Sequence, residues 1–412
     1  MTSAILYSVR IMCAAIAIVC GWTAAGADIL VQRINGPPIN AGNVTLQEAT
    51  IEIVPAEDAP ESSTITRDQL ISLTFDNDFV DAPQGNLLEF ANGDRLIVTV
   101  LEAGENAVRA RVGDQEINVP LGQLRGIVWD ASKTEADWWS MLFRERGADD
   151  LVLLTNGDRS AGQFVGVSET DFRLLLDGRT LTVPRERVAA LAFSPELISV
   201  PESPPERQIV LTASGWLTVT GLTGATNGAL EGQTRFGEMI QFPPGSIRRI
   251  QFLGTHVISL TDIKPAQVEF TPWLSRQWPV RFNRSLTDHP LALGEQVYAR
   301  GIGMHSRTRI TYALDGTYDR FSVTAGLADS AGSLGSVAIA VEVDGEIIER
   351  RERVTREGGR VEFDGISVTH AKSLSLIADF GANGDIRDRV NWCAPILIRD
   401  AKMGQTNGSS IE

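Results

Sequence analysis

The amino-acid sequence predicts an all-β protein in which tandem small β-barrel-like repeats precede a larger β-domain. Short runs rich in Val, Ile, Phe and Tyr alternate with Asp-Gly, Asn-Gly and other glycine-rich turns, a pattern typical of strands and hairpins. A four-residue motif also returns 64 positions later in the same context, which indicates a repeated unit. With 412 residues, of which 43% are hydrophobic, the chain can supply the cores of two to four domains.

Residues 1–27 have the features of a secretory signal peptide. A single basic residue, Arg10, precedes an apolar run that ends at Val19, and the small residues up to Ala27 suit a cleavage site before Asp28. The apolar run is short for a membrane span. The alternatives to cleavage after Ala27 are an uncleaved anchor and lipoprotein processing at Cys20, which Val19 fits poorly. We expect a secreted, periplasmic or cell-envelope protein with no membrane contact beyond this segment.

Charge and cysteine content narrow the range of partners and reactions. The formal net charge of −15 argues against nucleic acid or anionic lipid as the main partner, because both require a basic face. Loss of residues 1–27 would remove Cys13 and Cys20 and leave Cys393 without an intramolecular disulfide partner. We interpret Cys393 as a buried, unreactive thiol, since a nucleophilic cysteine would need a base that the sequence does not indicate.

The middle of the chain contains an internal repeat, which we divide into repeat 1 (85–130) and repeat 2 (149–195). Three landmarks recur at an offset of 64 positions without a gap: Asn92-Gly-Asp-Arg95 as Asn156-Gly-Asp-Arg159, Pro120 as Pro184, and Trp129 as Phe193. Each copy is predicted to be a meander with an Asn-Gly hairpin turn near its start. The segments 92–129 and 156–193 should therefore have the same strand order.

Two weaker copies flank this pair. Repeat 3 (208–254) contains Met239-Ile-Gln-Phe-Pro243 at the place of a penultimate strand, and the N-terminal unit (28–80) is a partial repeat whose Ile65–Phe75 parallels Leu181–Phe193. Units of this size loosely resemble SH3-like or Sm-like small barrels. Each would be marginal alone, so we expect neighbours to pack on one another in a compact rod.

Three shorter segments separate or follow the units. Residues 131–148 form a predicted helical insertion with apolar residues on a helical period, and its Trp138, Trp139, Leu142 and Phe143 either cover a barrel edge or form an exposed partner-binding stripe. Residues 196–207 form a proline-rich linker that cannot extend a sheet. The polar tail, 401–412, is predicted to be disordered.

The C-terminal segment 262–400 carries several motifs in a fixed order. They are Val268–Trp273, Gly301-Ile-Gly-Met-His305, Asp315-Gly-Thr-Tyr-Asp-Arg-Phe321, Gly335-Ser-Val337 and Asp388-Arg-Val-Asn-Trp392. With these motifs the segment resembles the NPCBM family of carbohydrate-binding modules. The resemblance implies a jelly-roll β-sandwich that binds sugar, such as a galactose-type glycan. Cys393 departs from the family pattern, in which an acidic or small polar residue commonly follows the tryptophan. A cut between 254 and 262 is expected to free a domain that folds alone.

Five residues are candidates for ligand binding: Tyr298, His305, Arg307, Arg389 and Trp392. Sugars bind by stacking an apolar ring face on an aromatic side chain while charged or amide groups take the hydroxyls, so these residue types suit the task. The alternative is structural, because a histidine in a strand after Gly-x-Gly and a tryptophan near a strand end also occur as core residues.

A calcium site is the second prediction for this segment. Asp379, Asp385, Asp388 and Asn391 are oxygen-bearing side chains around two glycines, and a hard cation wants six to eight oxygens. A Ca²⁺ ion here would be mainly structural. A solvated loop with Asx turns is the alternative.

Catalytic motifs are missing from the sequence. It has no His-Glu-x-x-His, no Gly-x-Ser-x-Gly and no phosphate-binding loop, and its four histidines lie at unrelated spacings. We therefore predict a secreted, non-catalytic carbohydrate-binding protein. The alternatives are a structural or protein-interaction scaffold with protein partners in the cell envelope, or an accessory subunit of a separately encoded glycosidase.

Overall fold

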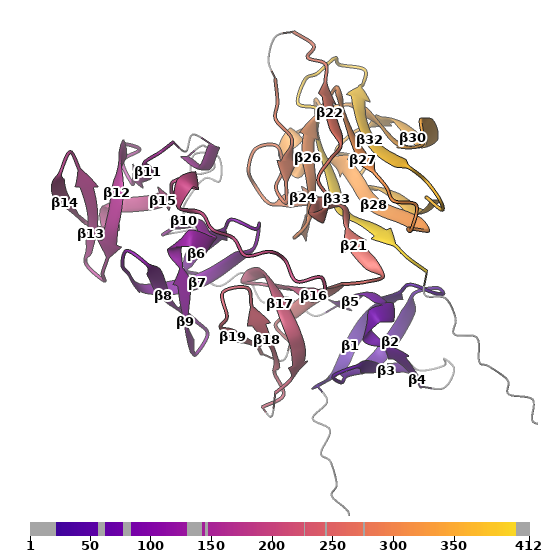
Figure 1. Ribbon diagram of the computed structural model, residues 1–412, viewed down its shortest axis with the longest axis horizontal. Coiled ribbons are helices and arrows are strands. Elements are labelled where there is room, and N and C mark those ends of the chain that lie inside the picture. The colour runs from indigo at the N-terminus through magenta and orange to yellow at the C-terminus, as the bar shows by residue number, and fades with distance from the viewer. Residues whose placement is uncertain are drawn as a thin grey trace, which may run out of the picture.

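The computed structural model describes residues 22–56, 62–76, 84–129, 142–144, 147–225, 227–243, 245–274 and 277–400. Almost all of the regular structure in these ranges is β-strand, as the sequence predicts. Figure 1 shows two parts, a row of small β-units built from β1–β20 and a sandwich built from β21–β33. None of the described helical segments has the length and apolar character that crossing a membrane would need.

Repeats 1 and 2 are built in the same way, and each strand of repeat 2 begins and ends 64 residues after its counterpart. Repeat 1 consists of β6 (Asn86–Phe90), β7 (Arg95–Ala103), β8 (Ala107–Val112), β9 (Gln115–Pro120), the 3-10 turn η2 (Leu121–Gln123) and β10 (Leu124–Val128). Repeat 2 consists of β11 (Asp150–Leu154), β12 (Arg159–Val167), β13 (Asp171–Leu176), β14 (Arg179–Pro184), η3 (Arg185–Arg187) and β15 (Val188–Ala192). The strand order is the same in both, as predicted.

The shared Asn-Gly-Asp turn explains why the first hairpin forms at the same place in both copies. The Asn92 side chain accepts a hydrogen bond from the Asp94 backbone amide at 3.0 Å, and Asn156 does the same for Asp158 at 3.1 Å. The intervening Gly93 has a φ of +94°, in the left-handed region that glycine adopts without strain.

The other two units repeat this topology. The N-terminal unit contains β1 (Trp22–Arg33), β2 (Ile39–Leu46), β3 (Thr50–Pro55), β4 (Ser63–Thr66), η1 (Arg67–Gln69) and β5 (Leu70–Asp76). Repeat 3 contains β16 (Arg207–Thr212), β17 (Gly215–Gly224), β18 (Leu230–Thr234), β19 (Met239–Phe242) and β20 (Ile247–Leu253). In all four units the first strand pairs with the second and the fifth, the second with the third, and the third with the fourth.

The N-terminal unit is therefore complete, where the sequence predicts only a partial repeat. Its first strand, β1, begins at Trp22, so the predicted cleavage position after Ala27 lies inside this strand. Residues 1–21, which hold most of the predicted signal peptide, are outside the described ranges, as is the tail from 401.

The units join through their last strands. β10 pairs with β15 so that Ile127 faces Leu191, and β5 pairs with β20 so that Leu73 faces Ile250. These residues occupy equivalent positions in their units, so each pair of units has an approximate twofold relation. A further pairing between β7 and β17 joins repeat 1 to repeat 3. Figure 1 accordingly shows a row of repeat 2, repeat 1, repeat 3 and the N-terminal unit.

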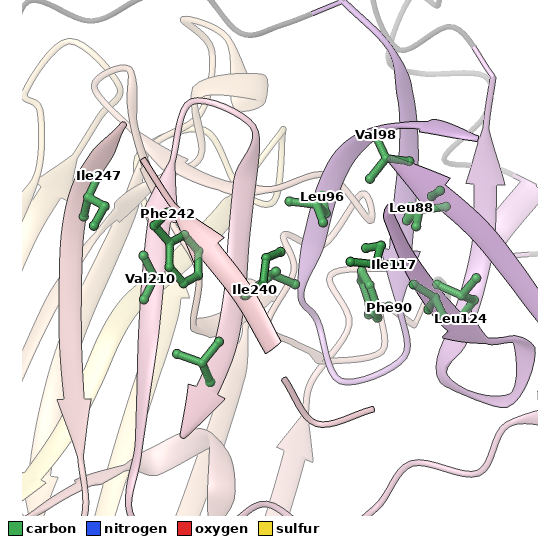
Figure 2. Packing of buried hydrophobic residues seen from close by; sticks show 14 of the residues in the cluster. Leu88, Phe90, Leu96, Val98, Ile117, Leu124, Val210, Ile240, Phe242 and Ile247 are labelled. Atoms are coloured by element: carbon green, nitrogen blue, oxygen red, sulfur yellow. The ribbon is translucent and has the colours of Figure 1, made fainter. Parts of the chain in front are cut away.

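Buried apolar side chains run through the whole row as one cluster. Figure 2 shows part of it, with Leu88, Phe90 and Ile117 inside repeat 1 and Val210 and Phe242 inside repeat 3. Because each unit is small, burial against a neighbour adds apolar contact that one unit could not supply. The likeness to SH3-like or Sm-like barrels stays a prediction.

Most of the predicted helical insertion, including Trp138 and Trp139, lies outside the described residues. Residues 142–144 are helical. Leu142 and Phe143 are buried in a small cluster with Val128, Leu153 and Ala190, so these two side chains cover the joint between repeats 1 and 2.

The sandwich consists of two antiparallel sheets. One has the order β23 (Arg281–Phe282), β26 (Gly301–His305), β33 (Arg389–Ile398), β28 (Arg320–Leu327) and β31 (Val361–Ser367), with β21 (Val257–Ser259) also on β33. The other has the order β22 (Gln267–Phe270), β27 (Thr308–Ala313), β32 (Ser373–Phe380), β29 (Val337–Val343) and β30 (Glu346–Val354). A hairpin of β24 (Leu291–Leu293) and β25 (Gln296–Tyr298) lies beside them. Fully buried aromatic residues fill the space between the sheets: Tyr312, Phe321, Phe363 and Trp392.

The structure allows only the first part of the predicted cut range, 254–262, and places the domain start before the predicted residue 262. β21 pairs with β33, and Leu260 in the following 3-10 turn η5 (Leu260–Asp262) belongs to the sandwich core. A cut near 262 would therefore remove a strand and a core residue, so a separable domain has to begin before Val257.

The sandwich is docked on the row of units by buried charges. Arg125 and Asp288 form an ion pair at 2.8 Å, and Arg300 and Asp94 form another at 2.7 Å; all four side chains are at most 6% exposed. Repeat 2 has Ala189 at the place of Arg125. Arg125 thus docks the sandwich without a counterpart in repeat 2, whereas Asp94 belongs to the turn shared by both repeats and also pairs with the sandwich.

Candidate functional site

Four loops meet at the end of the sandwich that points away from the β-units, where β22 and β32 are labelled in Figure 1. We call this region the loop end; its described segments are 271–274, 277–280, 305–307, 328–336 and 381–388. Backbone and side-chain hydrogen bonds tie the segments together. The Thr271 amide donates to the Arg307 carbonyl at 2.9 Å, and the Asn383 side chain donates to the Leu334 carbonyl at 2.9 Å.

The loop end carries aromatic side chains that reach the surface. Trp273 is 56% exposed, and its ring meets Phe380 edge to face at a centroid distance of 5.0 Å. Gly384 lies beside the same ring, where an added Cβ would be 3.4 Å from it, so the loop approaches Trp273 closely. Trp278 stacks on the His305 imidazole at 5.1 Å with 14° between the planes. Two tryptophans held by neighbouring groups provide apolar faces at fixed positions.

Charged groups also lie at this end of the sandwich. Arg307 pairs with Asp379 at 3.3 Å, and Asp379 also lies 3.9 Å from Arg350. The His305 ring is buried, and its Nδ1 lies 2.7 Å from the Ser306 carbonyl oxygen. Because a carbonyl only accepts, Nδ1 carries the hydrogen in this contact. The loop end therefore combines apolar faces with hydrogen-bond donors and acceptors.

Asp388 joins three of the loops from inside the protein. Its side chain is fully buried, accepts a hydrogen bond from the Ser306 hydroxyl at 2.6 Å, and accepts another from the Ser336 amide at 3.2 Å. Burial raises the pKa of Asp388 from 3.8 to about 6, against the lowering effect of the two hydrogen bonds. This carboxylate positions the loops and does not face a ligand.

Comparison with known proteins identifies the C-terminal part of the chain. Residues 258–398 match the family model of the NPCBM/NEW2 domain. This segment is an NPCBM/NEW2 domain. A search of curated proteins found no significant match to the chain.

Several solved structures are similar to parts of the chain. A CBM51 module from Clostridium perfringens GH95 in complex with methyl-galactose is 18% identical, with 34% of this chain and 99% of that chain covered and a TM-score of 0.32. A structure of CBM51-2 in complex with GlcNAc and INT domains from Clostridium perfringens ZmpB is 18% identical, with 49% and 39% covered and a TM-score of 0.32. The tandem CBM51 modules of Sp3GH98 from Streptococcus pneumoniae are 10% identical, with 90% and 88% covered and a TM-score of 0.31.

Three of the predicted ligand-binding residues lie at the loop end of the NPCBM domain. His305 and Arg389 face each other across β26 and β33, and Arg307 follows in the next turn. Arg389 donates to the Ser330 carbonyl at 3.1 Å, so it also holds the 328–336 loop.

The other two predicted ligand-binding residues are core residues of the NPCBM domain. Trp392 is fully buried and stacks on Phe363 at 5.8 Å, and Tyr298 is 6% exposed in a cluster with Leu293 and Cys393. A ring without an exposed face cannot stack on a sugar, so the ligand-binding prediction was wrong for Trp392 and Tyr298. Cys393 is buried, and burial raises the pKa of its thiol, in keeping with an unreactive group.

The four predicted calcium ligands do not share one site. Asp379 pairs with Arg307, Asp388 is bound by two serines, and the Asn391 amide donates to the Ala292 carbonyl at 3.1 Å on another flank. Within the described ranges no group of three or more His, Cys, Asp or Glu side chains is placed to hold a metal ion. The Asp388 and Asn391 side chains are structural here, and a Ca²⁺ site that includes Asp385 stays a prediction.

Sequence reasoning missed the aromatic residues of the loop end, Trp273, Trp278 and Phe380. A signal was present, because two tryptophans lie five positions apart beside Pro272 and Pro279. Proline keeps this segment out of a central strand. Aromatic side chains on such a segment have no sheet face to pack against, which favours an exposed loop.

Proposed function

We propose that this protein binds carbohydrate without catalysis, through the loop end of its NPCBM domain, after export to the cell envelope or the medium. The observation that carries the proposal is the exposed Trp273 ring, braced by Phe380 in a loop of an NPCBM/NEW2 domain. An exposed tryptophan held in one orientation is a ready platform for the apolar face of a sugar ring.

Polar groups beside the platform supply the second half of sugar recognition. Arg307 is more than half exposed and lies next to Asp379, so the pair offers donors and acceptors for neighbouring hydroxyls. A Trp278 ring stacked on buried His305 marks a second place where a sugar unit could rest. The surrounding protein has a net charge of −15, which favours a neutral glycan over a polyanionic one at this surface.

The ligand class that the family resemblance implies is a galactose-type glycan. The four β-units then serve as a support that holds the domain with its loop end outward. In this role the buried pairs Arg125–Asp288 and Arg300–Asp94 fix the domain on repeat 1.

The test is a glycan-array screen of the full chain, followed by titration with methyl-galactoside and N-acetylglucosamine. Trp273→Ala and Trp278→Ala remove the two aromatic faces. Ile347→Ala is the matched control, because Ile347 is 46% exposed on β30 at the opposite end of the sandwich. We expect binding by the wild type and the control, and loss with Trp273→Ala. No glycan binding by the wild type, together with retention of envelope proteins, would favour the scaffold alternative.

A further inference from the structure

A pocket lies away from the loop end, where repeat 1, the linker, repeat 3 and the sandwich meet. Its volume is about 850 Å³, within the range of about 300–1,000 Å³ that is usual for ligand sites. Basic residues dominate its charged lining: Arg207, Arg235, Arg300 and Arg399, against Glu202 and Asp262. Such a concentration of arginine stands out in a protein with a net charge of −15.

Two of these arginines already have carboxylate partners. Arg207 is paired with Asp262, and Arg300 is paired with Asp94 at 2.7 Å. The Asp94 carboxylate is held in place, because it also accepts hydrogen bonds from the Thr218 amide and hydroxyl and from the Asn92 side chain. It therefore cannot move to pair with another arginine.

Arg235 feels the charges of both ion pairs, Arg207–Asp262 and Arg300–Asp94, and has no carboxylate partner of its own among the described residues. It follows β18, and Asp94, Arg300, Arg207 and Asp262 all act on its charge. No ion pair or hydrogen bond joins its guanidinium to another described residue, and its Nε is buried. Loss of hydration lowers the pKa of Arg235 below its usual value, but an arginine stays charged at neutral pH. With Asp94 counted, four guanidinium groups, those of Arg207, Arg235, Arg300 and Arg399, thus lie near three carboxylates, those of Asp94, Asp262 and Glu202.

We propose that this pocket binds a small monocarboxylate, with Arg235 as its anchor. A guanidinium and a carboxylate match in shape and form two parallel hydrogen bonds. The single negative charge offsets the excess of one positive charge. A doubly charged phosphate fits less well, because Asp94 and Asp262 stay in the pocket and repel the second charge.

A free organic acid and an acidic sugar both carry such a single carboxylate. The pocket volume admits a sugar ring, and Phe282, 38% exposed in the lining, offers it an apolar contact. The site is separate from the loop end, and the inference does not depend on the proposed function.

The experiment is calorimetric titration of the full chain at low ionic strength, where charge pairing is least screened. The probes are sodium acetate, D-glucuronate, D-glucose and inorganic phosphate. Arg235→Gln removes the positive charge, and Arg235→Lys keeps the charge but cannot donate two parallel hydrogen bonds. Arg179→Gln is the control, because Arg179 lies on exposed β14, outside the pocket.

We expect glucuronate to bind the wild type and Arg179→Gln equally, and Arg235→Gln about tenfold or more weakly, as loss of a charged hydrogen-bond pair implies. Arg235→Lys should give an intermediate affinity, which guards against an effect of misfolding in Arg235→Gln. Acetate binding as tight as glucuronate would assign the site to the carboxylate alone; weaker acetate binding would assign it to an acidic sugar.

Three results would overturn the inference: no binding of either carboxylate to the wild type, equal affinity of wild type and Arg235→Gln, or tighter binding of phosphate or glucose than of glucuronate. Neutral glycan binding at the loop end is expected to be the same in all Arg235 variants, so failure of this inference and failure of the proposed function are distinguishable.

Discussion

Replacing Asp388 with asparagine removes a buried negative charge while keeping the shape of the side chain. Asparagine can accept from the Ser336 amide, and the Ser306 hydroxyl can turn to accept from the new amide group. In the folded protein the pKa of Asp388 is about 6, compared with 3.8 for the free group, and burial is the main cause. The folded state therefore holds the proton more tightly than the unfolded chain.

The magnitude follows from this difference. Each pH unit between the two pKa values corresponds to about 1.4 kcal/mol, so the ionised carboxylate lowers the free energy of unfolding by about 3 kcal/mol at pH 7. This penalty falls as the pH drops through 6 and is gone only well below 3.8, where both states carry the proton. Asp388→Asn should thus raise the free energy of unfolding by about 1–3 kcal/mol at pH 7, and by about 0.5 kcal/mol or less at pH 4.

The assay is urea unfolding of wild type and Asp388→Asn at pH 7 and pH 4, each with calcium and with EDTA. Taking the difference between the two proteins cancels the other titrating groups. If Asp388 were a calcium ligand, the gain at pH 7 would be smaller in calcium than in EDTA by about 2.7 kcal/mol at a hundredfold excess over the dissociation constant, enough to cancel or reverse it. A less stable variant at pH 7 in EDTA would refute the reasoning about burial.

Three further predictions concern the core, the docking interface and the row of units. Trp392→Ala should lower the free energy of unfolding by about 3–5 kcal/mol in a thermal or urea melt, since the ring is fully buried; a small loss would contradict its place in the core. Arg125→Ala should cost about 3 kcal/mol, because buried Asp288 would keep only Arg281, 3.7 Å away, as a charged partner, and proteolysis between the units and the sandwich should become faster. Repeat 2 has alanine at the equivalent position, so unfolding of repeat 1 in this variant would argue against a docking role. Gly126→Ala should destabilise the repeat 1–repeat 2 pair by about 1–3 kcal/mol, because a Cβ there would lie 2.1 Å from the Leu191 carbonyl oxygen; a variant as stable as the wild type would contradict the β10–β15 pairing.

The repeats could be predicted from the sequence because repeats 1 and 2 keep the same length in every strand and turn. Asn92 and Asn156 make the same local hydrogen bonds, and local turn chemistry leaves a visible motif. The N-terminal unit was only half recognised because its first turn keeps Asn35-Gly36 but not the Asp-Arg that follows the glycine in repeats 1 and 2. The place of β1 rests on its pairing with β5, which depends on contacts across the unit.

The loop end was harder to predict because its parts are brought together by the sandwich. Trp273 meets Phe380, and Asp379 meets Arg307, across more than 70 positions of sequence. Read along the chain, Asp379 to Asn391 looks like a cluster of oxygen ligands. In three dimensions these side chains bind separate partners, which are an arginine, a serine and a backbone carbonyl. A local sequence pattern cannot predict such partners, because they are distant in sequence.

The central claim is that the loop end of the NPCBM domain binds sugar by stacking on Trp273. The most direct measurement is calorimetric titration of the tightest glycan from the array screen into wild type, Trp273→Ala and Ile347→Ala, with thermal melts of all three. We predict that Trp273→Ala binds about tenfold more weakly or worse, that Ile347→Ala binds like the wild type, and that all three melt alike because both side chains are about half exposed. Wild-type affinity in Trp273→Ala would contradict the claim.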